Sequence, residues 1–202
     1  MIRNIIFDMG GVLRVWDPEE FMEAMKIPAD DRKILMREIF GAVEWPMQDL
    51  GLITEEETLE RVRARIPERL HCAAEKLVLH WEDLSRPVPG MADAIRRLKE
   101  NGYGIWLLSN ASKRHRQYWG KIPGSEYFDG LVISAFEGVL KPDLSIYRTI
   151  LSRFGLKAEE CVFTDDMPAN AAGALAAGMD AFVFRGTEDF LRELRARGVR
   201  GL

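Results

Sequence analysis

The chain has 202 residues, 47% of them hydrophobic, which is typical of one globular domain with room for a small insert. Its 28 lysines and arginines against 32 aspartates and glutamates leave a net charge of −4, which argues against a nucleic-acid partner because binding phosphates needs a basic face. The two cysteines, Cys72 and Cys161, are too far apart in the sequence for a metal motif, and we expect no disulfide framework. No apolar run is long enough to span a membrane. We therefore expect a cytoplasmic protein without a membrane segment.

The first predicted element is a buried strand at residues 5–7, which is followed by Asp8 and by the glycines at 10 and 11. The glycines let the backbone turn where this strand ends. In open parallel sheets ligands bind at this edge. An aspartate at this position can be a nucleophile, a metal ligand or the cap of the next helix, and the local sequence leaves all three open.

Residues 17–85 predict about four helices and no strand. In the first helix Asp17 can cap the N-terminus, Pro18 suits the first helical position and Glu20 completes a capping box. Further apolar stripes at helical spacing cover residues 31–40, 54–66 and 77–84.

The stretch Arg86-Pro87-Val88-Pro89-Gly90 indicates a boundary, where the chain leaves the helical insert and enters the core again. We therefore expect a core domain of residues 1–15 and 86–202 and a helical cap domain of residues 16–85. Because the cap follows the strand that carries Asp8, it is placed to act as a lid.

Strands and helices alternate after residue 90. The predicted strands cover residues 105–108, 131–133, 161–163 and 181–184, and the predicted helices cover 91–98, 143–154, 168–177 and 187–197. Strands that are apolar on both faces and separated by helices are typical of a parallel sheet covered on both sides. The expected fold class is therefore α/β, a Rossmann-like parallel sheet of about five strands with helices on both faces and a helical-bundle cap inserted after the first strand.

Polar residues follow four of these strands and should meet at one edge of the sheet: Asp8, the pair Ser109-Asn110, Lys141, and the pair Asp165-Asp166. Taken singly, Ser109-Asn110 can be a turn, Lys141 a surface lysine, and one aspartate of the pair a helix cap. Neighbouring carboxylates repel each other unless a cation or a helix N-terminus compensates them. The convergence of all four favours a catalytic or metal site.

The chain resembles the haloacid dehalogenase-like hydrolase superfamily over essentially its whole length. Four motifs carry the resemblance: Phe7-Asp8-Met9-Gly10-Gly11-Val12, Leu108-Ser109-Asn110, Lys141-Pro142, and the stretch from Phe163 to Asn170. It is most similar to the small phosphatases with a helical cap and an Asp-x-Gly-Asn/Gly-Val first motif, the group of the bacterial glucose-1-phosphate phosphatase.

This resemblance implies that Asp8 is the nucleophile that attacks phosphorus and forms an aspartyl-phosphate. It also implies a Mg²⁺ ion held by Asp8, by the backbone carbonyl of Gly10 and by Asp166, with Asp165 bound directly or through water. An all-oxygen, partly hydrated site of this kind suits Mg²⁺.

The resemblance further implies that Ser109 and Asn110 bind the phosphoryl oxygens. Lys141 would offset negative charge between the nucleophile and the phosphate. Such roles fit phosphoryl transfer, which depends mostly on positioning and on charge neutralisation.

The chain departs from most phosphatases of this superfamily at Gly10, where they have a second aspartate as general acid and base. Losing a general acid typically costs about 10² to 10⁴ in rate. His115 is the first substitute that we consider, against the alternative of an exposed helix residue in the stretch 112–119. Arg14, Trp16 and Asp17 follow the first strand and are expected on the substrate side of the site.

Trp45, Met47 and Gln48 are expected in a loop of the insert, where they either select substrate or form part of the insert's core. The expected function is Mg²⁺-dependent hydrolysis of a small phosphorylated metabolite, with a sugar phosphate as one candidate. The alternatives are a catalytically weak phosphate- or partner-binding module, a 2-haloacid dehalogenase, and a phosphotransferase or mutase. The oligomeric state is left open.

Overall fold

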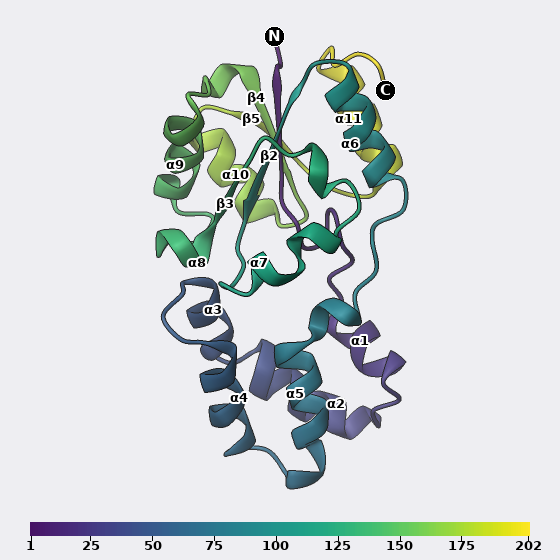
Figure 1. The fold of residues 1–202 in the computed structure, drawn as a ribbon, viewed down its shortest axis with the longest axis vertical. Helices are drawn as coiled ribbons and strands as arrows, with labels where there is room; N and C mark the ends of the chain where they lie inside the picture. The colour runs from purple at the N-terminus through teal and green to yellow at the C-terminus, as the bar shows by residue number, and fades with distance from the viewer.

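The computed structural model describes residues 1–202, and one parallel sheet lies at the centre of its upper half (Figure 1). The five strands are β1 (Asn4–Phe7), β2 (Gly104–Ser109), β3 (Gly130–Ile133), β4 (Cys161–Asp165) and β5 (Asp180–Val183). Their order in the sheet is β3-β2-β1-β4-β5, with every neighbouring pair parallel. The α/β fold class is therefore confirmed.

Helices cover both faces of the sheet because the strand side chains are apolar on both faces. On one face Ile5 and Phe7 share a core with α6 (Met91–Glu100) and α11 (Thr187–Ala196). On the other face Ile6 packs in a second core with α9 (Leu144–Phe154) and α10 (Pro168–Ala176). The two pairs of helices lie on opposite sides of the strands in Figure 1.

The helices of the insert form the lower half of the molecule (Figure 1). They are α1 (Pro18–Ala24), α2 (Ala29–Leu35), η1 (Met36–Phe40), α3 (Glu44–Asp49), α4 (Glu55–Arg63), η2 (Glu68–Leu70), α5 (His71–Leu79) and η3 (Trp81–Asp83). They surround a third core, which includes Phe21, Leu35 and Leu77. The domain boundaries proposed from the sequence stay a prediction.

Two details of the insert differ from the sequence expectation. The segment expected as one helix over 31–40 is α2 followed by one π-helical turn, η1. The stretch of Trp45, Met47 and Gln48 was expected as a loop but forms the short helix α3. Pro46 is tolerated inside this helix because it falls in the first turn.

Loops and short helices complete the upper half. The short helices are α7 (His115–Tyr118), η4 (Trp119–Lys121), η5 (Ser125–Tyr127), α8 (Ser134–Glu137) and η6 (Ala158–Glu160). The loop after β2 and helix α8 both face the insert, since Lys113 donates to the carbonyl of Gly51 at 2.9 Å and Ser134 donates to the carbonyl of Asp49 at 2.6 Å.

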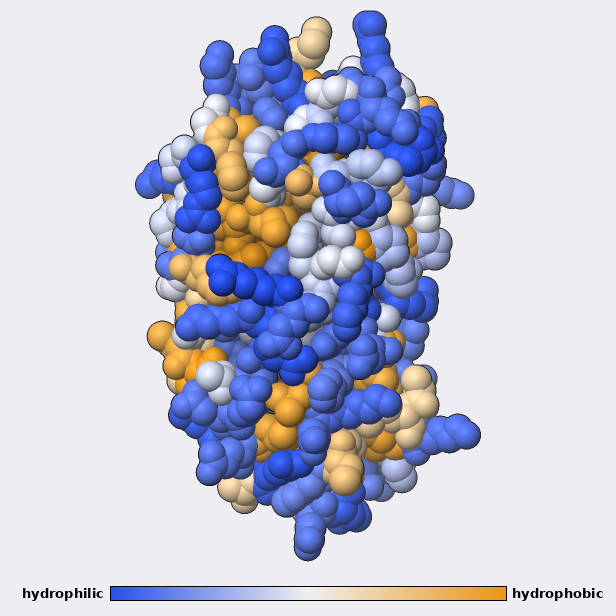
Figure 2. Space-filling view, viewed as in Figure 1, coloured by the Kyte–Doolittle hydropathy of each residue, from blue (hydrophilic) through white to orange (hydrophobic).

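Much of the face seen in Figure 2 is hydrophilic; its broadest hydrophobic patch lies in the upper half, and smaller ones lie in the lower half. Few large apolar side chains are well exposed, among them Val43 and Leu52 in the insert and Met167 beside the sheet edge. No helix has both the length and the apolar composition that a membrane crossing requires.

Candidate active site

Strand β1 carries Asp8 to the carboxyl edge of the sheet, where its backbone N–H donates to the carbonyl of Thr164 on β4 at 3.0 Å. The residue as a whole is only 8% exposed. Gly11 is needed next to it, because its φ is +71° and a Cβ at this position would lie 2.5 Å from the carboxyl group of Asp166. At Gly10 a Cβ would meet Trp16 at an ordinary 3.7 Å, so the absence of a side chain there is not enforced by space.

Lys141 is buried between two carboxylates and is not a surface lysine. Its Nζ lies 2.9 Å from Oδ1 of Asp8 and donates a hydrogen bond to Oδ2 of Asp165 at 2.6 Å. Burial by itself would lower the pKa of Lys141, but the two carboxylates outweigh it and raise this pKa above its ordinary value. The side chain is therefore a fixed positive charge beside Asp8.

Asp165 is fully buried, and both of its oxygens accept hydrogen bonds. Besides the bond from Lys141, Asp165 accepts from the backbone N–H of Met167 at 2.9 Å and from the side-chain amide of Asn170 at 3.0 and 3.1 Å. Asp166 is only partly buried and lines the cavity described below. Of the neighbouring pair, Asp165 therefore anchors the loop, while Asp166 faces the cavity.

Carboxylate oxygens of Asp8, Asp165 and Asp166 lie within 4.8 Å of one another. Burial and the charge of Asp165 raise the pKa of Asp166, and burial also raises the pKa of Asp8 against the opposing effect of Lys141. A cation between these groups would relieve their repulsion. The hard oxygen donors at this edge therefore fit a Mg²⁺ ion.

The Ser109-Asn110 pair ends β2 at the same edge. The amide of Asn110 is used by the backbone of Lys141, accepting from its N–H at 2.8 Å and donating to its carbonyl at 3.1 Å. It therefore holds the Lys141 loop in place. The hydroxyl of Ser109 is buried without a hydrogen-bond partner, which leaves it able to donate to a ligand oxygen.

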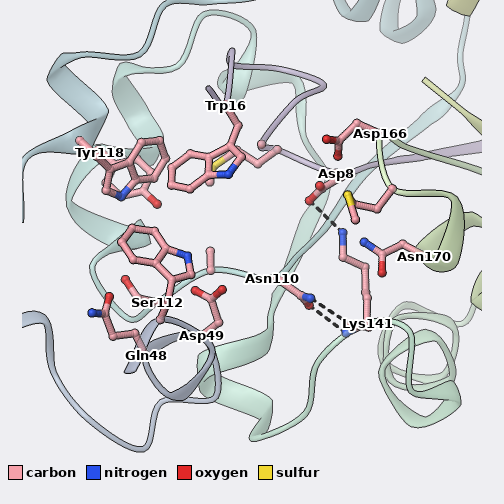
Figure 3. A pocket seen from close by; sticks show the side chains of 16 residues that line it. Asp8, Trp16, Gln48, Asp49, Asn110, Ser112, Tyr118, Lys141, Asp166 and Asn170 are labelled. Atoms are coloured by element: carbon pink, nitrogen blue, oxygen red, sulfur yellow. Dashed lines mark hydrogen bonds and ion pairs between the residues drawn. The ribbon is translucent and has the colours of Figure 1, made fainter. Parts of the chain in front are cut away.

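A cavity of about 200 Å³ lies between the sheet edge and the insert (Figure 3). The sheet side provides residues of the predicted site: Asp8, Gly10, Asn110, Lys141 and Asp166. The insert and its connections provide Trp16, Trp45, Gln48, Asp49 and Trp81, while Ser112 and Tyr118 come from the segment after β2. Asp49, Trp81, Ser112 and Tyr118 were not predicted as site residues, since they belong to no recognisable motif.

His115 does not line this cavity, and the expectation that it is exposed was wrong. It is 1% exposed, stacked on Trp119 with ring centroids 5.1 Å apart, because α7 turns its apolar face toward the core. Burial lowers the pKa of His115 to about 4, so it is neutral near pH 7. It faces a separate depression beside Phe136 and Arg153 instead.

Asp17 and Arg14 also lie away from the cavity wall. Asp17 caps α1, accepting from the N–H of Glu20 at 3.1 Å, while Glu20 pairs with Arg86 rather than completing a capping box. Arg14 is buried against the carbonyl oxygens of Glu82 and Ser85. Of the three residues expected on the substrate side, only Trp16 is part of the cavity wall.

Trp45 and Gln48 line the cavity from helix α3, not from a loop, whereas Met47 does not line it. The ring of Trp45 also packs on Trp16 and Phe40, so it serves both the cavity and the core of the insert. Gln48 is buried, and its amide nitrogen has no hydrogen-bond partner, which leaves a donor for a ligand.

The chain thus combines a Rossmann-like parallel sheet and a helical insert with a buried aspartate–lysine pair and a carboxylate cluster at the carboxyl edge of the sheet. A family model for haloacid dehalogenase-like hydrolases matches residues 2–178. The chain belongs to this family of hydrolases.

Relatives of this chain include enzymes with a phosphatase name. A sesquiterpene phosphatase of Aspergillus oryzae is 28% identical over 194 residues, which cover 86% of this chain and 85% of that protein. A drimenol cyclase of Aspergillus calidoustus is 29% identical over 198 residues, 96% of this chain but only 36% of that protein. A glyceraldehyde 3-phosphate phosphatase of Pyrococcus furiosus is 33% identical over 104 residues, half of this chain and 42% of that protein.

Among solved structures, an enzyme of the same family from Bacteroides thetaiotaomicron, in complex with magnesium and inorganic phosphate, has a TM-score of 0.73 at 24% identity. The comparison covers 96% of this chain and all of that one. This similarity supports the fold, with the insert included.

Proposed function

We propose that this protein is a Mg²⁺-dependent phosphomonoester hydrolase that works through an aspartyl-phosphate on Asp8. The observation that carries the proposal is the pairing of a buried Asp8 with Lys141 at 2.9 Å beside two further carboxylates, in the wall of a cavity. An anionic phosphate can approach a carboxylate only where positive charge compensates both. The phosphatase names among the relatives agree with this assignment.

Each residue of the site then has a chemical task. Asp8 attacks phosphorus, Lys141 holds one Asp8 oxygen and compensates charge, and the free hydroxyl of Ser109 donates to a phosphoryl oxygen. Asn110 and Asp165 keep Lys141 in place through the hydrogen bonds described above. Mg²⁺ held by Asp8, Asp166 and the Gly10 carbonyl, with Asp165 beside it, would neutralise phosphate charge and orient the substrate.

The substrate that we propose is a small phosphorylated metabolite, because residues of both the core and the insert line the cavity, which holds only about 200 Å³. Two classes fit its wall. The first class is a sugar phosphate. The apolar face of a sugar ring can stack on the indole rings of the cavity wall, and a sugar hydroxyl can accept a hydrogen bond from the unpaired amide of Gln48. The same rings suit an apolar leaving group, as the sesquiterpene phosphatase among the relatives indicates.

We propose a cytoplasmic location from the two free cysteines.

The test is phosphate release from a panel of sugar, triose and isoprenoid monophosphates, with Mg²⁺ or with a chelator. We expect metal-dependent turnover that Asp8→Asn lowers by more than about 10³-fold, because the nucleophile is removed. Asp17→Asn is the matched control, since Asp17 is an exposed helix cap outside the cavity, and this variant should keep full activity.

Two other outcomes would replace the proposal. Binding of Mg²⁺ and phosphate without any turnover would identify a binding module. Metal-independent release of halide from 2-haloacids would identify a dehalogenase, although the carboxylate cluster opposes an anionic substrate in the absence of a cation.

A further inference from the structure

Cleavage of a phosphomonoester needs a proton for the leaving oxygen, because an alkoxide is a poor leaving group. The titratable side chains that line the cavity are Asp8, Asp49, Tyr118, Lys141 and Asp166. Asp8 is the proposed nucleophile, and Asp166 belongs to the carboxylate cluster. Lys141 is paired with carboxylates that raise its pKa, and burial raises the pKa of Tyr118 well above its ordinary value, so neither gives up a proton readily. Asp49 is the remaining group.

Asp49 is the last residue of α3, and Figure 3 shows its carboxyl group directed from the cap into the cavity. On the far side of the same cavity lie Asp8 and Lys141. No hydrogen bond or ion pair occupies the Asp49 carboxyl group. The leaving group of a phosphate bound at Asp8 would point away from the sheet and toward this carboxyl group.

The core domain holds the backbone around Asp49. The hydroxyl of Ser134 donates to the carbonyl of Asp49 at 2.6 Å, and Nζ of Lys113 donates to the carbonyl of Gly51 at 2.9 Å. Gly51 has a φ of +70° and packs so tightly on Ala135 that a Cβ would lie 2.2 Å from its carbonyl oxygen. The position of Asp49 relative to the sheet edge is therefore determined by the core and not by the cap alone.

The surroundings of Asp49 favour its protonated form. Burial, followed by the negative charges of Asp8 and Glu55, raises the pKa of Asp49 to about 7, and Lys141 opposes this effect. A carboxyl group with a pKa near 7 exchanges protons efficiently at neutral pH. The neighbouring Glu55 is held by a hydrogen bond from Ser112, so it does not enter the cavity as a competing acid.

We propose that Asp49 is the general acid and base of the reaction. It carries out the proton transfers for which Gly10 has no side chain. The proposal rests on the phosphatase function. In the first step an Asp8 oxygen bonds to phosphorus, the bond from phosphorus to the leaving oxygen breaks, and Asp49 gives its proton to that oxygen. In the second step Asp49 takes a proton from water, water oxygen bonds to phosphorus, and the bond to Asp8 breaks, releasing phosphate.

The test compares substrates that differ in their need for a proton. For Asp49→Asn we expect kcat/KM for an alkyl phosphate to fall by about 10² to 10³, and that for p-nitrophenyl phosphate to change by less than about fivefold, since nitrophenolate leaves without a proton. Asp49→Glu should restore part of the alkyl activity. Asp30→Asn, which removes an exposed cap carboxylate, is the matched control and should leave both substrates unchanged.

The pH profile gives a second readout. In the natural protein kcat/KM for the alkyl phosphate should fall as pH rises through about 7, because Asp49 loses its proton. In the Asp49→Asn variant this fall in kcat/KM at high pH should be absent. A Gly10→Asp substitution in the Asp49→Asn variant should recover alkyl activity, because position 10 lines the cavity and has room for a side chain.

The role of Asp49 would be overturned, while the phosphatase function stands, by either of two results in Asp49→Asn. One is an equal loss of kcat/KM for the alkyl phosphate and for p-nitrophenyl phosphate; the other is a fall of kcat/KM with rising pH that matches the natural protein. A natural protein without metal-dependent turnover would overturn both.

Discussion

At the scale of single residues, the site depends on a lysine that is buried between carboxylates. Lys141 contacts Asp8 and Asp165 and has no exposed side-chain surface. A buried ion pair is costly to break from one side, because the partner charges are left without compensation. Lys141 therefore contributes to folding as well as to chemistry.

Lys141→Met in the metal-free protein should lower the free energy of unfolding at pH 7 by about 3 to 5 kcal/mol, because Asp8 and Asp165 stay buried without their cation. The raised pKa of Lys141 means that its stabilisation is complete below the pKa of an unfolded lysine, so it is fully present at pH 7. Urea unfolding at pH 7 and pH 4 would test this. The loss should shrink at pH 4, because burial raises the pKa of Asp8 to about 7 and its carboxyl group is then protonated and neutral.

Lys121→Met is the control, since Lys121 is exposed and forms no ion pair, and it should change stability by less than about 0.5 kcal/mol. A loss for Lys141→Met as small as that of the control would show that the carboxylates find other compensation in the folded protein.

At the scale of elements, the short helix α3 connects the cap to the chemistry. Its residues Trp45, Gln48 and Asp49 line the cavity, and Gly51, two residues after its end, packs against α8 of the core. A change at Gly51 should therefore act on catalysis without removing any polar group from the site.

Gly51→Ala should lower kcat/KM for alkyl phosphates by at least about tenfold and leave p-nitrophenyl phosphate less affected, because the added Cβ pushes α3 and Asp49 away from the sheet edge. Gly138→Ala is a matched control, since Gly138 has a similar φ of +67° but no atom within 4 Å of an added Cβ. Both variants carry the backbone cost of about 1 to 2 kcal/mol for a left-handed residue. Equal kinetics for the two variants would refute a positioning role for the contact.

At the scale of the whole molecule, the chain passes between core and cap twice, at residues 13–15 and at residues 86–88. These two segments hydrogen-bond to each other through their backbones. Val15 N–H donates to the carbonyl of Arg86, and Val88 N–H donates to the carbonyl of Leu13, both at 2.9 Å. The guanidinium group of Arg14 donates to the carbonyls of Glu82 and Ser85, and its Nε donates to the Ser85 hydroxyl. Arg14 therefore links the two connections at the junction of core and cap and does not line the cavity.

Arg14→Ala should loosen this junction, because it leaves a buried carbonyl group at Glu82 and a partly buried one at Ser85 without this donor. We expect faster hydrogen exchange at residues 82–88, by about tenfold or more, with little change in the sheet strands. Arg86→Ala is the control, since Arg86 lies at the same junction but is exposed and pairs only with Glu20. Exchange in Arg14→Ala that matches the control would argue against this role.

Much of the fold could be predicted from local sequence patterns. The buried strands, the Gly-terminated helices and the Asp17 cap each depend on a few neighbouring residues. The short helix α3 was missed because a six-residue helix with an internal proline has too little periodicity to be recognised. His115 was misjudged because its burial, at 1% exposure, depends on how its short helix packs on the rest of the domain, which the local sequence pattern does not show.

The sequence by itself determined the sheet edge where Asp8, Lys141 and the aspartate pair meet, because the carboxyl ends of parallel strands share one edge whatever covers it. Only the tertiary structure decided that Lys141 is buried between two carboxylates, that the amide of Asn110 holds its loop, and that Asp49 faces Asp8 across the cavity. The first two facts depend on contacts between loops that follow different strands of the core. The third depends on how the cap lies on the core, which contacts between residues far apart in the chain determine.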